Sequence, residues 1–102
     1  MTRAELLERA LAAVNKRPKA YGPPEQNFER IARLWTDHLL NRYRETVVLD
    51  LVDVACMMIL MKVARIEETP DHVDSWTDIA GYAACGAEVR GATIEAGEVM
   101  GI

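Results

Sequence analysis

Aromatic residues are scarce in this chain of 102 residues, of which only 6% are Phe, Trp or Tyr. Its core must consist mainly of Ala, Leu, Val, Ile and Met, since hydrophobic residues still make up 50% of the sequence. Basic residues are also few, because 12 Lys and Arg stand against 16 Asp and Glu and give a net charge of −4. Overall charge therefore does not favour a nucleic-acid partner. The length suits a single domain.

Cysteines and long apolar runs are limited as well. Cys56 and Cys85 lie in apolar stretches without the spacing of a zinc site, which is typical of buried thiols in a reducing compartment. The longest apolar run, Val54–Met61, is far shorter than the ~20 residues that cross a bilayer. The sequence also lacks a Gly-rich phosphate loop, a zinc-protease motif and a Ser/His/Asp signature. We expect a cytoplasmic protein without membrane association, whose catalytic residues, if any, stay unknown.

Helical periodicity dominates the rest of the sequence, with hydrophobic residues repeating three and four positions apart. A capping box at Thr2 and Glu5 predicts that the first helix starts at once. We expect the first two helices over residues 2–15 and 25–40. The third should begin between residues 46 and 50 and end at 68, and the fourth should run from 71 to at least 89. Residues 16–24 hold three prolines and a glycine, which predicts a loop. Residues 90–102 hold three glycines and should fray or serve a partner.

These elements predict an all-α fold of four helices, a single domain over residues 1–102 with its core at 21–89. The connection at 66–70 is short, so the third and fourth helices should form an antiparallel central hairpin. The third helix is apolar around nearly its whole circumference, as central helices are. Four helices bury such an element only with help, which predicts a homo-oligomer. A Met-rich binding groove is the alternative that this pattern leaves open.

Two cations and three carboxylates gather around the turn between the third and fourth helices. Matched levels in the hairpin place Arg65 near Asp74, and Lys62 near Asp78. Tyr82 shares the helical stripe of the two aspartates, at about 100° per residue. The carboxylates are caps of the fourth helix, or members of a structural ion-pair network, or part of a site. In that site the aspartates bind Mg²⁺ and the two cations bind phosphate oxygens.

Two other segments leave a similar choice. Asp50 and Asp53 are spaced as the N-cap and N3 residues of the third helix or, alternatively, as an acidic pair for a metal. In the basic loop, Lys19 and Tyr21 are placed to hold a phosphate and to stack on a base. The alternative is a solvated loop with its tyrosine packed on the core. His72 is expected to be a surface or capping residue.

Three stretches of the sequence carry a resemblance to a known family. They are "YGPPEQNFERIARLW", "DVACMMILMKVAR" and "PDHVDSWTDIAGYAA". In their order of Tyr-Gly, Asn-Phe, Trp, Lys-x-x-Arg, Asp-Ser-Trp and Asp-x-x-Gly-Tyr they resemble small phage and prophage proteins described as a domain of unknown function. The resemblance covers residues 21–89. It implies a phage or prophage origin, with the bacterial host cell as the compartment, and it implies no activity.

A remoter similarity is to the all-α nucleotide pyrophosphatases, the MazG-like and dimeric dUTPase-like enzymes, which hold Mg²⁺ with acidic pairs on helices. The chain also looks like a phage domain, associated with nucleotide modification, that carries Lys-x-x-Arg. The pyrophosphatases have Glu-x-x-Glu and Glu-x-x-Asp pairs. This chain has Asp50-x-x-Asp53 and Asp74-x-x-x-Asp78 in their place, so enzymatic activity is left open.

Our first hypothesis is a protein that binds a nucleotide or a related phosphorylated small molecule. The residues expected at the ligand are Lys19, Tyr21, Lys62, Arg65 and Tyr82, and those expected at Mg²⁺ are Asp74 and Asp78. Its enzymatic version is a Mg²⁺-dependent pyrophosphatase, and its non-enzymatic version sequesters nucleotides against host defence. The alternative from a different class is a protein–protein interaction module whose charges are purely structural.

Overall fold

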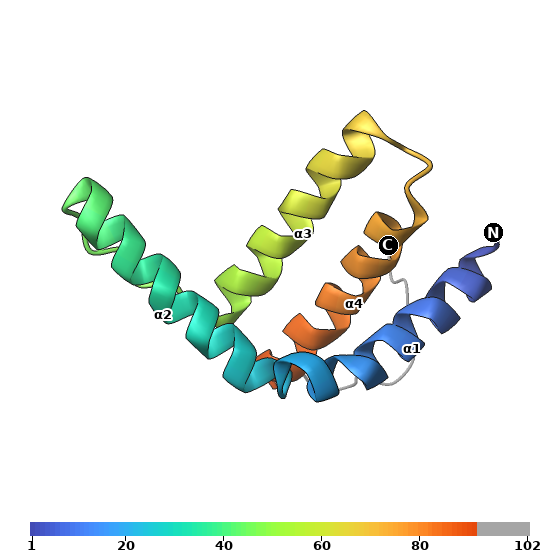
Figure 1. Ribbon diagram of the computed structural model, residues 1–102, viewed down its shortest axis with the longest axis horizontal. Coiled ribbons are helices and arrows are strands. Elements are labelled where there is room, and N and C mark those ends of the chain that lie inside the picture. Colours follow the sequence, from blue (N-terminus) through green and yellow to red (C-terminus); the bar gives the residue numbers. More distant parts are fainter. Residues whose placement is uncertain (92–102) are drawn as a thin grey trace.

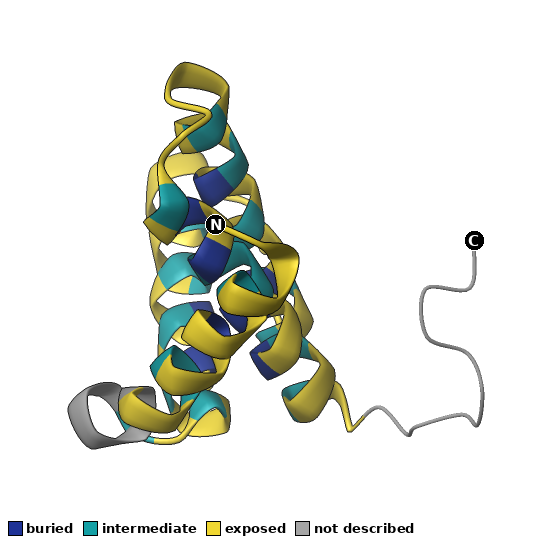
Figure 2. Cartoon of the chain, turned by 90° about the vertical axis from the view of Figure 1, so that its right-hand side faces the viewer, coloured by how far each residue is buried: buried dark blue, intermediate teal, exposed yellow. Residues whose placement is uncertain are grey.

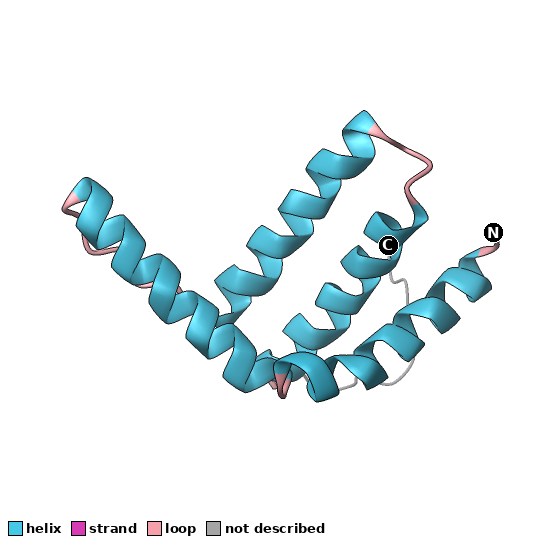
Figure 3. Cartoon of the chain, in the orientation of Figure 1, coloured by secondary structure: helices cyan, strands magenta, loops and turns pink. Residues whose placement is uncertain are grey.

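Four helices and their connections make up the computed structural model of the protein (Figure 1). The structure describes residues 1–91, except for the side chains of residues 17–21. In chain order the helices are α1 (Arg3–Tyr21), α2 (Pro24–Tyr43), α3 (Leu51–Glu68) and α4 (Val73–Arg90). The described residues form no strand (Figure 3), which confirms the all-α prediction. Within residues 1–91, no helix has the length and hydropathy needed to cross a membrane. Most of the predicted tail, residues 92–102, lies outside the described residues.

The predicted antiparallel pair of α3 and α4 forms the centre of the fold (Figure 1). α4 lies between α3 and α1, and the most extensive helix contact is between α3 and α4. α1 packs mainly on α4, and α2 packs mainly on α3. The two outer helices diverge from an elbow at Gly22, whose φ of +81° lies in the left-handed region that favours glycine. The elbow therefore directs α1 and α2 to different helices of the central pair.

The loop predicted over residues 16–24 is confirmed only at residues 22 and 23 and is wrong for residues 16–21, because α1 continues through Pro18 to Tyr21. Proline removes one N–H from the helix and costs about 3 kcal/mol in a helix interior. Here it stands in the last two turns of a helix that is already established, so it weakens α1 without ending it. The other two prolines mark the boundary. Pro23 is the N-cap residue of α2 and Pro24 its first residue, where no N–H is needed.

Local hydrogen bonds fix the start of α3. Asp53 N donates to Asp50 Oδ1 at 2.8 Å, and Asp50 N donates to Asp53 Oδ2 at 2.9 Å. This capping box confirms the N-cap and N3 interpretation, and both carboxylates are engaged. Residues 45–50 form the non-helical lead-in, which Leu49 N ties to α2 by donating to Thr36 Oγ1 at 3.0 Å.

The start of α4 differs from the expected aspartate cap. His72 is the N-cap residue, in agreement with the capping position expected for it, but it makes no side-chain bond to the free backbone N–H groups. Of the two carboxylates that the sequence offered as caps, Asp74 lies in the first turn of α4, and Asp71 lies before the N-cap residue. The turn is held by side chains instead. His72 Nδ1 lies 2.6 Å from Ser75 Oγ, and Trp76 Nε1 donates to Pro70 O at 2.8 Å. These bonds position the first turn of α4 beside the end of α3.

The buried core is small and lies along the inner faces of the helices (Figure 2). Its hydrophobic members are Ala10, Phe28, Ala32, Val54, Ala55, Tyr82 and Cys85. Phe28 and Tyr82 stack with ring centroids 6.2 Å apart and join α2 to α4. The opposite face of α3 is uncovered, with Leu60 64% exposed. Cys56 is also exposed, against the expectation of two buried thiols, because it lies on this outer part of α3.

A close approach of α3 and α4 at Gly86 supports a first prediction. A Cβ added at Gly86 would lie 2.9 Å from Ala55 Cβ, which is closer than carbon atoms pack. Overpacking of this kind costs about 1–3 kcal/mol, and the better helix propensity of alanine returns only about 1 kcal/mol. We expect Gly86→Ala to lower the free energy of unfolding by about 1 kcal/mol in urea denaturation.

The matched control is Gly81→Ala on the same helix. Its Cβ would lie 3.7 Å from Val14 Cγ1, which is an ordinary contact. This variant should be neutral or more stable by up to about 1 kcal/mol. Equal effects of the two substitutions would show that the α3–α4 spacing at Gly86 is wrong.

Candidate site between α1 and α4

A pocket of about 360 Å³ lies between α1 and α4 and carries charges of both signs. α1 contributes Arg9 and Lys16, and α4 contributes Asp74, Thr77 and Asp78. The two cations are seven residues apart, so they share one face of α1 two turns from each other. Ala12 and Ala13 lie between them, and because their side chains are small the pocket stays open. The two aspartates are one turn apart on α4 and face the same space.

Two ion pairs engage the aspartates. Asp74 Oδ1 accepts a hydrogen bond from Arg9 Nη2 at 3.0 Å, and both side chains are at least half exposed. Lys62 Nζ lies 3.0 Å from Asp78 Oδ2, and here only 11% of the lysine side chain is exposed. The hairpin register thus confirms the predicted approach of Lys62 to Asp78. The predicted partner of Asp74 is wrong, because α1 supplies that cation.

Thr77 adds an unsatisfied polar group to the pocket wall. The residue is 6% exposed, and its Oγ1 has no hydrogen-bond partner among the described residues. A covered hydroxyl without a partner costs about 1–3 kcal/mol. Thr77 lines the pocket. Rotation about its Cα–Cβ bond would exchange the positions of the hydroxyl and the methyl group, and another rotamer would direct the hydroxyl into the pocket.

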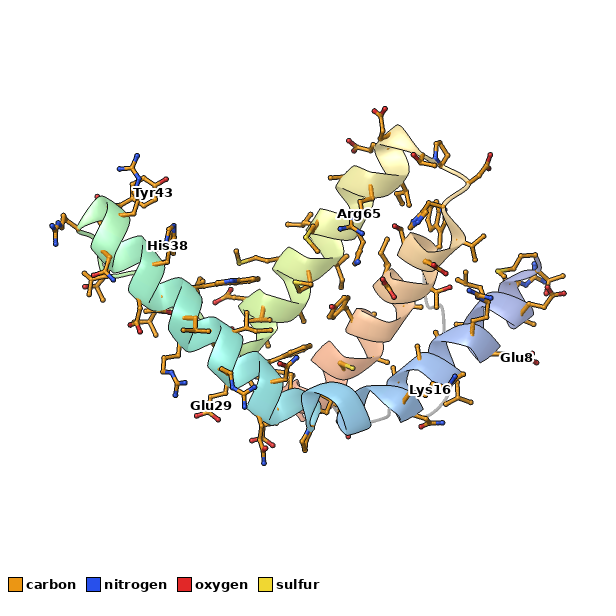
Figure 4. The ribbon with its side chains drawn as sticks, viewed as in Figure 1. Glu8, Lys16, Glu29, His38, Tyr43 and Arg65 are labelled. Atoms are coloured by element: carbon orange, nitrogen blue, oxygen red, sulfur yellow. The ribbon has the colours of Figure 1, made fainter. Side chains whose placement is uncertain are left out.

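The other predicted site residues lie elsewhere. Arg65 lines a different surface hollow with Glu68, Thr69 and His72, and Figure 4 shows it on α3 while Lys16 is on α1, with α4 between these helices. Tyr82 is 5% exposed, stacks in the core and lines an apolar groove between α3 and α4. The side chains of Lys19 and Tyr21 lie outside the described residues.

Three residues of the pocket are absent from the predicted site, namely Arg9, Lys16 and Thr77. Arg9 and Thr77 stand in regular helices, where a single charge or hydroxyl is unremarkable, and Lys16 falls in the stretch predicted to be a basic loop. The available signal was the seven-residue spacing of Arg9 and Lys16 across two alanines, which places both cations on one helical face. Nothing in that spacing says that the face meets α4, so the pocket needed the tertiary structure.

The pocket combines donors of the kinds that bind anions with two carboxylates. Arg9 and Lys16 offer charged donors, and the hydroxyl of Thr77 offers one more. Within the described part of the chain, no group of three or more His, Cys, Asp or Glu side chains is placed to hold a metal ion. Both aspartates are paired with cations, and they orient Arg9 and Lys62.

Comparison with known proteins adds the family. The model of the domain of unknown function DUF6378 matches residues 5–90, which include the whole pocket and all four helices except the first two residues of α1. The chain belongs to this family. The Gene 55 protein of Mycobacterium phage D29 is 46% identical to the DUF6378 chain over 81 residues, which cover 78% of the chain and 50% of that protein. The Gene 55 protein of Mycobacterium phage L5 is 46% identical over 68 residues, which cover 67% of the chain and 40% of that protein.

These relatives confirm the resemblance to a phage family of unknown function. The DUF6378 chain spans about half the length of the curated relatives that it matches. No solved structure matches the chain.

Proposed function

We propose that this DUF6378 protein binds a small phosphorylated molecule in the pocket between α1 and α4, in the cytoplasm of the phage's bacterial host. A nucleotide is the class that we would test first. The observation that carries the proposal is the meeting of two cations, Arg9 and Lys16, at one pocket with Thr77, whose buried hydroxyl is unsatisfied and would reach the pocket in another rotamer. A phosphate group needs several donors at once, and these are three donors of the kinds that bind it.

The size of the pocket and the availability of Lys16 support this class of ligand. Its volume of about 360 Å³ falls in the range of about 300–1,000 Å³ that small-molecule sites occupy. Lys16 is exposed and appears in neither of the two ion pairs of the described residues, so it is available to a ligand. Arg9 can turn a second N–H toward a phosphate while it keeps Asp74. Lys19 and Tyr21, on the next turn of α1, remain proposed contributors.

Mg²⁺ and catalysis are separate parts of the proposal. Magnesium keeps several waters and needs only one or two carboxylates beside substrate phosphates, which Asp74 and Asp78 would supply. Both carboxylates have cation partners, so the metal would have to compete with Arg9 and Lys62. A MazG-like pyrophosphatase requires that competition, whereas a binding protein that sequesters nucleotides does not. The binding protein is therefore our first choice.

The measurement is a thermal-shift series with phosphate, pyrophosphate and nucleoside mono-, di- and triphosphates, each with and without Mg²⁺. A ligand at 100 times its Kd should stabilise the wild-type protein by about 2.7 kcal/mol. Thr77→Val should leave the ligand-free protein unchanged or up to about 1 kcal/mol more stable, because it removes an unsatisfied hydroxyl. The same variant should lose most of the ligand response.

A charge control completes the design. Lys16→Gln should lose the response, while Arg30→Gln, which removes an exposed cation from α2, should keep it. The proposal fails if no phosphorylated compound stabilises the wild type, or if the Lys16 and Arg30 variants respond alike. A response that needs Mg²⁺ would favour the enzymatic version.

The interaction module remains the second candidate, and one observation favours it. The outer face of α3 exposes Met57, Leu60 and Met61 by 42%, 64% and 42%, although these are large apolar side chains. Exposed apolar surface of this kind marks protein contacts. Absence of any ligand response, together with association through α3, would make this candidate the better one.

A further inference from the structure

The uncovered face of α3 has the form of a ridge. Met57, Leu60 and Met61 recur at three- and four-residue spacing and stand on the side of the helix opposite the core residue Ala55. All positions from Val54 to Met61 are uncharged. We call these three residues the α3 ridge. Removal of such an apolar ridge from water lowers the free energy, so the ridge is a favourable surface for association.

A mostly apolar groove adjoins the ridge at Cys56. It has a volume of about 330 Å³, the described residues that line it all belong to α3 and α4, and Arg90 is the one charged residue among them. Small side chains make it hollow, namely those of Ala55, Cys56, Ala83, Gly86 and Ala87. Cys56 borders both features, because it lines the groove and lies one turn before Leu60 of the ridge. We call this hollow the α3–α4 groove.

We propose that two copies of the chain associate about a twofold axis, with the α3 ridge of each copy in the α3–α4 groove of the other. A closed twofold contact requires a surface that is complementary to itself, so that residue i meets j and j meets i. A ridge and a groove side by side on one chain meet this requirement. Large side chains entering hollows formed by small ones are also how helices pack inside proteins.

Self-complementarity and core size favour a second copy over a foreign partner. The ridge carries no charge, so two copies that each have a net charge of −4 bring no further like charges together at this contact. The core within one copy is also thin, since few large side chains are fully buried. An identical chain is a partner that is present whenever the protein is made.

Light scattering of the eluting protein, over a range from about 1 to 100 µM, tests the proposal. The wild type is expected to be a dimer at the upper end of this range. Leu60→Glu should weaken the dimer at least about 100-fold, since a charge must then be buried in both halves of the contact, in a groove that is apolar apart from Arg90 at its end. Ala83→Gln, which fills the groove without adding charge, should weaken it in the same direction. Leu60 and Ala83 are exposed, so both variants should fold, and circular dichroism verifies this.

The control is Leu34→Glu, which places the same charge at a 56% exposed leucine of α2, away from both features. It should leave the dimer unchanged. A wild-type protein that is monomeric at 100 µM would overturn the proposal. A dimer that survives Leu60→Glu, or that is lost equally with Leu34→Glu, would also overturn it, because association would then use another surface. These outcomes are independent of any phosphorylated ligand in the α1–α4 pocket.

Discussion

Asp78→Ala is expected to destabilise the protein by about 3 kcal/mol in urea denaturation. Lys62 is the reason, because only 11% of its side chain is exposed and its Nζ lies 3.0 Å from Asp78 Oδ2. Removing the carboxylate leaves a buried ammonium group without a partner, and such changes cost about 3–5 kcal/mol. We take the lower end of that range because Asp78 itself is 37% exposed and water screens the pair. The loss is large against the ~5–15 kcal/mol that stabilises a small domain.

Two controls separate this effect from a general loss of charge. Lys62→Met should cost less than about 1 kcal/mol, because the remaining carboxylate stays hydrated and methionine fills the buried site. Asp74→Ala should cost about 1 kcal/mol or less, since its pair with Arg9 is exposed. Asp78→Ala should therefore lower the free energy of unfolding much more than Lys62→Met or Asp74→Ala. If Lys62→Met were the most damaging of the three, the stranded-cation explanation would be wrong.

Phe28→Ala is expected to have the largest effect, a loss of about 3–5 kcal/mol in the free energy of unfolding. Phe28 is 2% exposed and is the only phenylalanine of the chain. Its ring stacks on Tyr82 and joins α2 to the central hairpin. Truncation opens a cavity at the meeting point of these helices, and few other aromatic side chains are available to fill it.

Chemical denaturation at one fixed protein concentration measures this loss, since association would make stability depend on concentration. Leu34→Ala, on the same helix but 56% exposed, should change stability by no more than about 0.5 kcal/mol. Phe28→Leu should fall between these two, because it keeps part of the buried volume. A loss below about 1 kcal/mol for Phe28→Ala would mean that α2 contributes little to the core.

Local features of this protein were determined by the sequence alone. The four helices follow from apolar residues at helical spacing, and the caps at Thr2 and Asp50 form with residues only three positions away. The pairing of Lys62 with Asp78 was also predictable, because a short connection fixes which levels of two antiparallel helices meet. The exception is the end of α1, where three prolines and a glycine over residues 16–24 predict a loop but the helix continues to Tyr21.

Contacts between distant segments were decided only by the tertiary structure. Arg9 and Asp74 are 65 positions apart, and no pattern in either helix names the other as its neighbour. For the same reason the sequence marked α3 as apolar all round but left open which face the chain would cover. Periodicity gives the direction of each side chain about its own helix axis. Which helix covers each face depends on how all four helices pack together. That packing brings Thr77 and Lys16 to one pocket and leaves Leu60 exposed to water.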